Sequence, residues 1–197
     1  KTWAFSSVAS NTAPELDMSS TDSLLHEAQI DRRYLEGLAC QRPTPLRLKD
    51  MYDYGTAPHN SQQRLRNAQF LHKEMPVRIA HRVLDLLTLP HGLSDAEPIR
   101  KVAKLYLNYL RTLQDFPNPV TDDQEVRFTE LLASFVLDRS YVPILVAQGV
   151  RAWWHKKHLE EGVVADTASR EMERALYRFF TARVGLRLIT EHYVLSS

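Results

Sequence analysis

Apolar positions that recur every three or four residues predict long helices along most of this chain. The clearest pattern spans residues 61–89. Its apolar positions lie on one helical face: Phe70, Leu71, Met75, Ile79, Val83 and Leu86. Pro76 lies inside that face, and a proline in a helix interior costs about 3 kcal/mol because it lacks a backbone N–H and crowds the preceding turn. We expect a long helix that is bent at Pro76.

The same spacing predicts three further long helices, at about 95–114, 121–159 and 165–192. Asp95 and Thr121 are the expected N-caps of the first two, since short polar side chains accept hydrogen bonds from the free amides of a first turn. Pro143 predicts a second bend. Four helices of about 20 to 35 residues, joined by turns that contain proline or glycine, predict an antiparallel four-helix bundle. No repeat period is visible, so a solenoid is the weaker alternative.

The chain before residue 61 has a shorter pattern. A first helix is expected over residues 23–37, with Gly37 as its stop. A short, strongly apolar helical segment is expected from Thr44 to Gly55. The first 22 residues are rich in Ser, Thr and Ala and have no apolar face, so we expect a disordered tail. The predicted layout is a tail, residues 1–22, and one helical domain, residues 23–197.

Composition excludes several classes of function. A formal net charge of +1 gives no strong field for nucleic acid or an anionic membrane surface. No apolar run approaches the ~20 residues of a membrane span. Cys40 is the only cysteine, so an internal disulfide is excluded. His155 and His158 lie three apart, but no cysteine or paired carboxylate completes a metal site, and no nucleophile with an adjacent base stands out.

The last predicted helix carries two arginines near its buried face. With Phe179 at the centre of the apolar stripe and about 100° per residue, Arg183 falls about 40° and Arg187 about 80° from the centre. A buried charge without a partner is costly, so an anion should lie beside Arg183. Two sources stay open: a carboxylate of a neighbouring helix, or a bound carboxylate or phosphate ligand, which paired arginines suit.

Four blocks of the sequence keep an order and spacing that resemble the mitochondrial 2-oxoacid dehydrogenase kinases, the pyruvate and branched-chain enzymes. The blocks are residues 43–55, 70–82, 142–150 and 181–187. The most specific reads Phe-Leu-His-Lys-Glu-Met-Pro-Val-Arg-Ile-Ala-His-Arg from Phe70 to Arg82, which is close to the family pattern Phe-Leu-x-Lys-Glu-Leu-Pro-Val-Arg-(Leu or Ile)-Ala. Residues 79–82, 114–117 and 183–187 look more like the branched-chain kinase than the pyruvate one.

The resemblance implies that this chain is the regulatory bundle of such a kinase. The family adds an ATP-binding domain of the histidine-kinase and Hsp90 type, which we expect to be missing here together with its ATP and Mg²⁺. The bundle docks the lipoyl domain of the acyltransferase core. The implied lipoyl-binding residues are Leu46, Met51, Tyr54 and Phe70. Methionine and tyrosine stand at two of these positions, where phenylalanine is common in the pyruvate kinases. From the residues alone, this aromatic cluster is either core or an exposed docking patch.

The resemblance also implies an allosteric pocket for 2-oxoacids and carboxylate inhibitors. Its residues would be Met75, Tyr106, Arg183 and Arg187. This agrees with the anion expected beside the arginines. Counting back from Ala147, Arg139 stands where the family has a histidine linked to catalysis, so we expect no catalytic residue in these 197 residues.

The full kinase is expected in the mitochondrial matrix, where it would phosphorylate a serine of the dehydrogenase subunit and inhibit a 2-oxoacid dehydrogenase complex, here the branched-chain one. The family's dimers form largely through the second domain, which leaves a homodimer open. Two other functions stay open as well. One is a non-catalytic family member that serves as a helical scaffold or assembly subunit, which Arg139 favours. The other is a small-anion sensor bundle with no kinase role.

Overall fold

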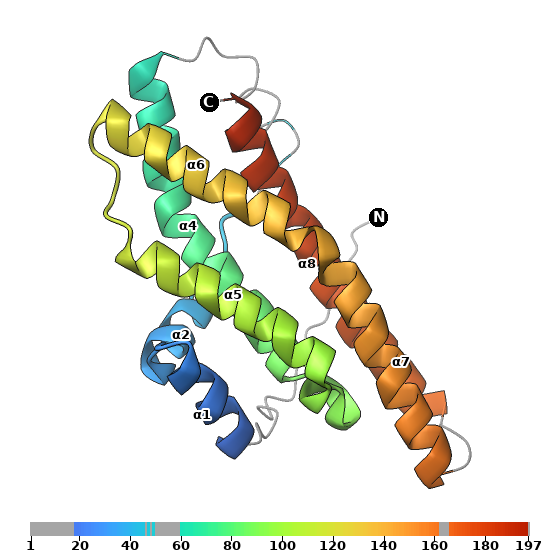
Figure 1. Ribbon diagram of the computed structural model, residues 1–197. Helices are drawn as coiled ribbons and strands as arrows, with labels where there is room; N and C mark the ends of the chain where they lie inside the picture. The colour runs from blue at the N-terminus through green and yellow to red at the C-terminus, as the bar shows by residue number, and fades with distance from the viewer. Residues whose placement is uncertain (1–17, 46, 48, 50–59, 162–165, 197) are drawn as a thin grey trace, which may run out of the picture.

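The computed structural model describes residues 18–45, 47, 49, 60–161 and 166–196. The described elements are α1 (Met18–Glu27), α2 (Arg32–Ala39), α4 (Ser61–Leu87), the 3₁₀ segment η1 (Pro90–Asp95), α5 (Glu97–Asp115), α6 (Asp122–Asp138), η2 (Arg139–Tyr141), α7 (Val142–Glu161) and α8 (Asp166–Ser196) (Figure 1). All of them are helical, which confirms the all-α prediction. No helix in the described part of the chain is long and apolar enough to cross a membrane.

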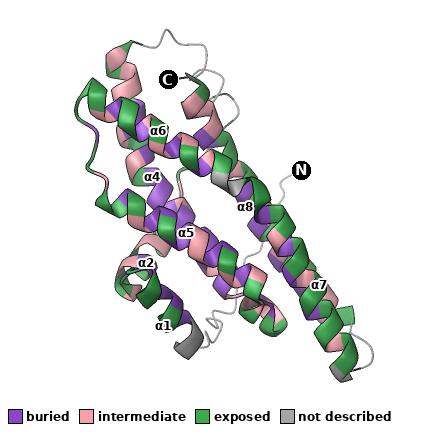
Figure 2. Cartoon of the chain, in the orientation of Figure 1, coloured by how far each residue is buried: buried purple, intermediate pink, exposed green. Residues whose placement is uncertain are grey.

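Helix α4 lies at the centre of the packing. It contacts α2, α5, α6 and α8, while α6 packs against α8 and α5 packs against α7. Figure 2 shows buried residues on the sides where these helices face one another and exposed residues on their outer sides. A helical bundle is therefore confirmed. The strict antiparallel arrangement of four helices stays a prediction.

The predicted long helix over residues 61–89 is confirmed as α4. Asn60 caps it, since its side chain accepts a hydrogen bond from the backbone N–H of Gln63 at 2.8 Å. Pro76 is buried inside α4 and the helix continues through it. The proline has no N–H for the carbonyl of His72, so the helix tolerates a local cost of about 3 kcal/mol. Burial of the surrounding apolar face offsets that cost.

The N-terminal predictions need correction. Residues 23–37 do not form one helix, because Gln29 adopts a left-handed conformation (φ 56°) between α1 and α2. Asp31 then caps α2 by accepting hydrogen bonds from the amides of Arg33 and Tyr34. Gly37 does not stop α2, which ends at Ala39.

The predicted disordered tail also extends too far, because its last residues are helical. Helix α1 begins at Met18, inside the predicted tail of residues 1–22, and Thr21 is buried. Residues 1–17 lie outside the described residues. So do most residues of the short apolar helix expected between Thr44 and Gly55.

Two further boundaries differ from the prediction. Asp95 does not cap α5; it ends η1, and the cap position is Ala96, which makes no side-chain bond. Thr121 does cap α6, with its Oγ1 3.3 Å from the amide of Gln124. The expected single helix over residues 121–159 is two helices, α6 and α7, separated by η2. Pro143 lies in the first turn of α7, where proline fits better than in a helix interior.

Helices α5 and α7 approach closely at Gly149. A Cβ atom at this glycine would lie 2.8 Å from Cγ1 and 2.9 Å from Cδ1 of Ile99, which is buried on α5. Glycine is therefore required by the distance between the helices, and not by its backbone conformation. This contact brings α7 against the rest of the bundle.

Candidate functional site

Helix α4 holds the chain that precedes it through Glu74 and Arg78. The backbone N–H of Thr44 donates to Glu74 Oε1 and the Thr44 hydroxyl donates to Glu74 Oε2, both at 2.8 Å. Arg78 donates through Nε to Glu74 Oε1 at 2.8 Å and through Nη2 to the carbonyl oxygen of Thr44 at 2.5 Å. The four bonds form a closed arrangement, which we call the Thr44 clamp (Thr44, Glu74 and Arg78). It explains why the most specific sequence block carries a Glu and an Arg four residues apart.

Other side chains of α4 bind backbone carbonyls on two sides. His81 Nε2 lies 2.9 Å from the carbonyl oxygen of Gln41. His72 Nε2 lies 2.8 Å from that of Phe116, and Gln69 Nε2 lies 2.9 Å from that of Pro119. Because a carbonyl oxygen can only accept, both histidines carry the proton on Nε2 in these contacts. The segment 41–44 and the loop before α6 are thus fastened to α4 by its side chains.

The four residues expected to bind the lipoyl group are only partly placed. Leu46, Met51 and Tyr54 lie outside the described residues. Phe70 is on α4, and 40% of its surface is exposed. It lies one turn before Glu74, so the two side chains share a face of the helix. Phe70 is exposed, as a docking residue would be, but the other three residues are not described. Lipoyl docking at these four residues therefore stays a prediction.

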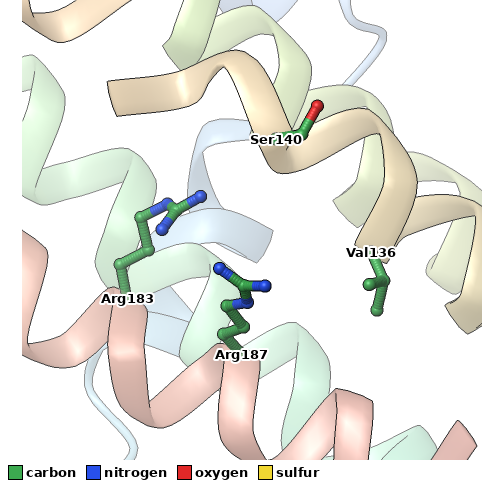
Figure 3. A pocket seen from close by; sticks show the side chains of 4 residues that line it. All are labelled: Val136, Ser140, Arg183 and Arg187. Carbon is green, nitrogen blue, oxygen red and sulfur yellow. The ribbon is translucent and has the colours of Figure 1, made fainter. Parts of the chain in front are cut away.

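The two arginines singled out in the sequence line one cavity. It has a volume of about 140 Å³ and lies between α8 and the end of α6, where its described lining residues are Val136, Ser140, Arg183 and Arg187. Figure 3 shows both arginine side chains rising from successive turns of α8 on the same side of the helix. Val136 and Ser140 were not predicted. Val136 lies in α6 and Ser140 in η2, and no motif marks either of them as a cavity residue.

The two arginines differ in burial as their helical angles predict. Arg183 is buried, with 9% of its surface exposed, whereas the side chain of Arg187 is 60% exposed. Arg187 donates through Nε to Glu191, one turn further along α8, at 2.5 Å. An ion pair this exposed is worth little, so Arg187 can turn to a ligand at small cost.

Met75 and Tyr106 do not line this cavity among the residues that the structure describes. Both are fully buried. Met75 Sδ accepts a weak hydrogen bond from Thr190 at 3.6 Å, and the ring of Tyr106 meets that of Phe179 edge to face at 6.4 Å. Thr190 follows Arg187 on α8 and Phe179 precedes Arg183. The two predicted residues therefore contact α8 from the core, on either side of the arginine turns.

A largely buried ion pair of α4, Arg82 with Asp85, contacts the same stretch of α8. Arg82 Nη1 lies 2.6 Å from Asp85 Oδ2 and 3.3 Å from the carbonyl oxygen of Phe179, while Arg178 Nε lies 3.6 Å from Asp85 Oδ1. Burial lowers the pKa of Arg82, and the charge of Asp85 only partly opposes this. Burial likewise raises the pKa of Asp85, against the opposing effect of Arg82. Both charges are costly in place, as is usual for a buried pair.

No group of three or more His, Cys, Asp and Glu side chains that could hold a metal occurs in the described residues. Arg139, which the sequence resemblance aligns with a family histidine, lies in η2 directly before Ser140 of the cavity lining. The described residues present no nucleophile with a base. What they do offer is a small cavity with two cations, which suits a small anion and not a covalent reaction.

Comparison with known proteins decides the family. Residues 45–197 match the family model described as mitochondrial branched-chain alpha-ketoacid dehydrogenase kinase. The chain belongs to the mitochondrial 2-oxoacid dehydrogenase kinase family. Among curated relatives of this family, the mitochondrial pyruvate dehydrogenase (acetyl-transferring) kinase of Arabidopsis thaliana is 32% identical over 155 residues, which are 79% of this chain.

Animal relatives in the family are more distant. Isozyme 4 of the mitochondrial pyruvate dehydrogenase kinase from Rhinolophus ferrumequinum is 26% identical over 173 residues, or 87% of this chain. Isozyme 1 from Rattus norvegicus is 26% identical over 155 residues, or 78% of this chain. The matched regions cover 40%, 40% and 34% of these three relatives, so the chain spans well under half of their length.

Sequence reasoning singled out the two arginines of the cavity but missed the Thr44 clamp. A signal for it was present, because Glu74 and Arg78 are charged residues four apart on an otherwise apolar face, and such charges need partners. Their common partner, 30 residues earlier in the chain, could not be identified from spacing. Comparison with relatives supports a kinase family and leaves the choice between branched-chain and pyruvate complexes open.

Proposed function

We propose that this chain is the regulatory bundle of a mitochondrial protein-serine kinase that phosphorylates and inhibits a 2-oxoacid dehydrogenase complex. The observation that carries the proposal is the cavity in which Arg183 and Arg187 line one wall. Two guanidinium groups one turn apart suit a planar carboxylate. In a member of this kinase family, a small-carboxylate cavity is best explained as a sensor of the 2-oxoacid that the complex consumes.

Cavity size and lining support a branched-chain 2-oxoacid. A volume of about 140 Å³ is close to the ~150 Å³ cavity that binds benzene in an engineered protein, so the cavity admits a small acid and excludes a nucleotide. Val136 supplies an apolar wall opposite the arginines, which favours an alkyl chain. We place the complex as the branched-chain one on this ground and on the family model.

Calorimetry with 4-methyl-2-oxopentanoate tests the sensor, with pyruvate as the competing ligand. Arg187→Gln removes an exposed charge and should leave the fold intact. We expect the dissociation constant to rise about 10- to 150-fold, which corresponds to the free energy of one hydrogen bond to a charged group. Arg170→Gln is the matched control, because Arg170 also pairs with a carboxylate four residues away on α8, at 2.7 Å, and lies outside the cavity lining. Equal affinities in the two variants would exclude Arg187 from the site.

The same proposal includes docking of the lipoyl domain of the acyltransferase core near Phe70, and ATP and Mg²⁺ binding outside this bundle. The exposure of Phe70 supports the first part. Binding of lipoylated and unlipoylated core domain to the wild type and to Phe70→Ala measures it. We expect binding that depends on the lipoyl group and that the substitution weakens.

A second function is a non-catalytic scaffold or assembly subunit of the same complex. Arg139 at the position of the family's histidine favours it. Phosphorylation of the dehydrogenase subunit by the full-length protein distinguishes the two. Docking without phosphate transfer would select the scaffold.

A further inference from the structure

The Thr44 clamp holds a segment of chain that lies outside the helices. Residues 42–45 form neither helix nor strand, and Thr44 and Pro45 are exposed. Glu74 is nevertheless buried, with 7% of its surface exposed, and both of its carboxylate oxygens accept from Thr44. Within the described residues, the hydrogen bonds of the buried Glu74 carboxylate go to exposed Thr44 and to Arg78. Bonds to a charged group are strong, so they fix the position of Thr44 closely.

The clamp lies on the same face of α4 as Phe70. Phe70, Glu74 and Arg78 follow one another at intervals of four residues, which places them in one row along the helix. Phe70 is exposed at one end of the row, and Thr44 is bound to Glu74, one helical turn further along. His81 extends the row and holds the carbonyl of Gln41 at 2.9 Å. Two pieces of chain about 30 residues apart in sequence thus meet one helical turn from Phe70.

We propose that Glu74 and Arg78 are positioning residues for docking: they hold residues 43–45 beside the exposed ring of Phe70, so that both pieces together contact the lipoyl-bearing domain. This rests on the proposed function, since the docked partner is the one named there. Neither clamp residue needs to touch the partner. Both act through Thr44, whose backbone they bind on its N–H and on its carbonyl side.

The chain itself offers a control of matching geometry on α5. Arg111 donates through Nε to Asp115 at 2.8 Å, four residues away, and through Nη1 to the carbonyl oxygen of Gln29 at 3.0 Å. This is the same arrangement of an arginine, a carboxylate and a backbone carbonyl, and it holds the turn between α1 and α2. Asp115→Asn therefore has the chemistry of Glu74→Gln without its place beside Phe70.

Two measurements on the whole chain test the proposal. Amide exchange of Thr44, followed by NMR, reports the clamp directly because that N–H is bound to Glu74. Calorimetry reports the affinity for the lipoylated domain. In Glu74→Gln we expect Thr44 to exchange about tenfold faster or more, and the dissociation constant to rise by a similar factor. In Asp115→Asn, whose carboxylate is more exposed than that of Glu74, we expect neither change.

The outcomes separate the clamp from the proposed function. Faster exchange with unchanged affinity would show that the clamp is structural only, and an equal loss of affinity in Asp115→Asn would show a general effect of stability; both overturn the proposal. Thr44→Val, which removes one of the four bonds and keeps the shape, should give an intermediate effect on both readouts. If the wild type does not bind the lipoylated domain, the proposed function fails, and docking by the clamp fails with it even when the exchange result is as expected.

Discussion

Replacing Gly149 with alanine would add a methyl group where α5 and α7 leave no room for one. The new Cβ would lie 2.8 Å from Cγ1 and 2.9 Å from Cδ1 of Ile99, whereas carbon atoms in contact prefer about 3.5–4.0 Å. Ile99 is β-branched and only 1% exposed, so it cannot move aside freely. Overpacking of this kind costs about 1–3 kcal/mol. Alanine in a helix interior gains about 1 kcal/mol over glycine, which offsets part of the cost.

Gly185→Ala separates the two effects. Gly185 lies in the interior of α8, and a Cβ there would meet no atom within 4 Å. The gain in helix propensity is therefore common to both variants, and their difference is the contact with Ile99 alone. We expect Gly149→Ala to be less stable than Gly185→Ala by about 1–3 kcal/mol in urea denaturation. For a chain of this size that corresponds to a difference of about 2–12 °C in the midpoint of thermal unfolding.

A second substitution identifies the clashing atom. Ile99→Val removes Cδ1 and on its own costs about 0.5–1.5 kcal/mol. Combined with Gly149→Ala, it should cost less than the sum of the two single changes, because the two residues are in contact and the clash is partly relieved. The reasoning is refuted if Gly149→Ala is as stable as Gly185→Ala, or if the two changes at the interface are additive.

Three further changes test the packing and the charges. Tyr193→Phe removes the hydroxyl that donates to buried Glu125 at 2.8 Å and should cost about 1–3 kcal/mol in urea denaturation; a loss below 0.5 kcal/mol, the lower bound for a typical net hydrogen bond, would contradict this. Because burial raises the pKa of Asp85, protonating it adds stability that is complete below its ordinary pKa of 3.8 and lost as pH rises through the raised value. Asp85→Asn should remove that pH dependence, so the stability of the wild type relative to this variant should rise as pH falls; no trend would refute it. Asp31→Ala should lower stability by about 0.5–2 kcal/mol through loss of the α2 cap, which thermal unfolding can measure against Asp115→Asn as a surface control.

Local rules predicted those parts of the fold that depend on neighbours in sequence. The apolar period gave α4 and α8 nearly to their ends, and Thr121 was recognised as a cap from its residue type. The angular position of Arg183, closer to the centre of the apolar stripe than that of Arg187, predicted its burial. Each of these depends on a helix's own geometry, which a sequence displays directly.

The rest required knowledge of partners far along the chain. Thr44 was expected at the start of a short helix, but its hydroxyl and amide both donate to Glu74. The break at η2 depends on how α6 packs on α8 and α7 on α5, and a proline alone is compatible with a bend or a break. Ser140 lies in η2 itself, so no helical spacing rule could place it at the cavity.

The side chains of α4 hold their neighbours by main-chain oxygen atoms, and this has a consequence for how substitutions are tolerated. His81, His72 and Gln69 bind carbonyl groups that every amino acid possesses, so the identity of the residues on the other end is not restricted by these bonds. Sensitivity to substitution should therefore be one-sided. Replacing residues 41 and 119 with every other amino acid should change stability little, whereas the same scan at residues 69, 72 and 81 should lower it. The segments that carry the carbonyl groups can therefore vary in sequence and still be bound to α4.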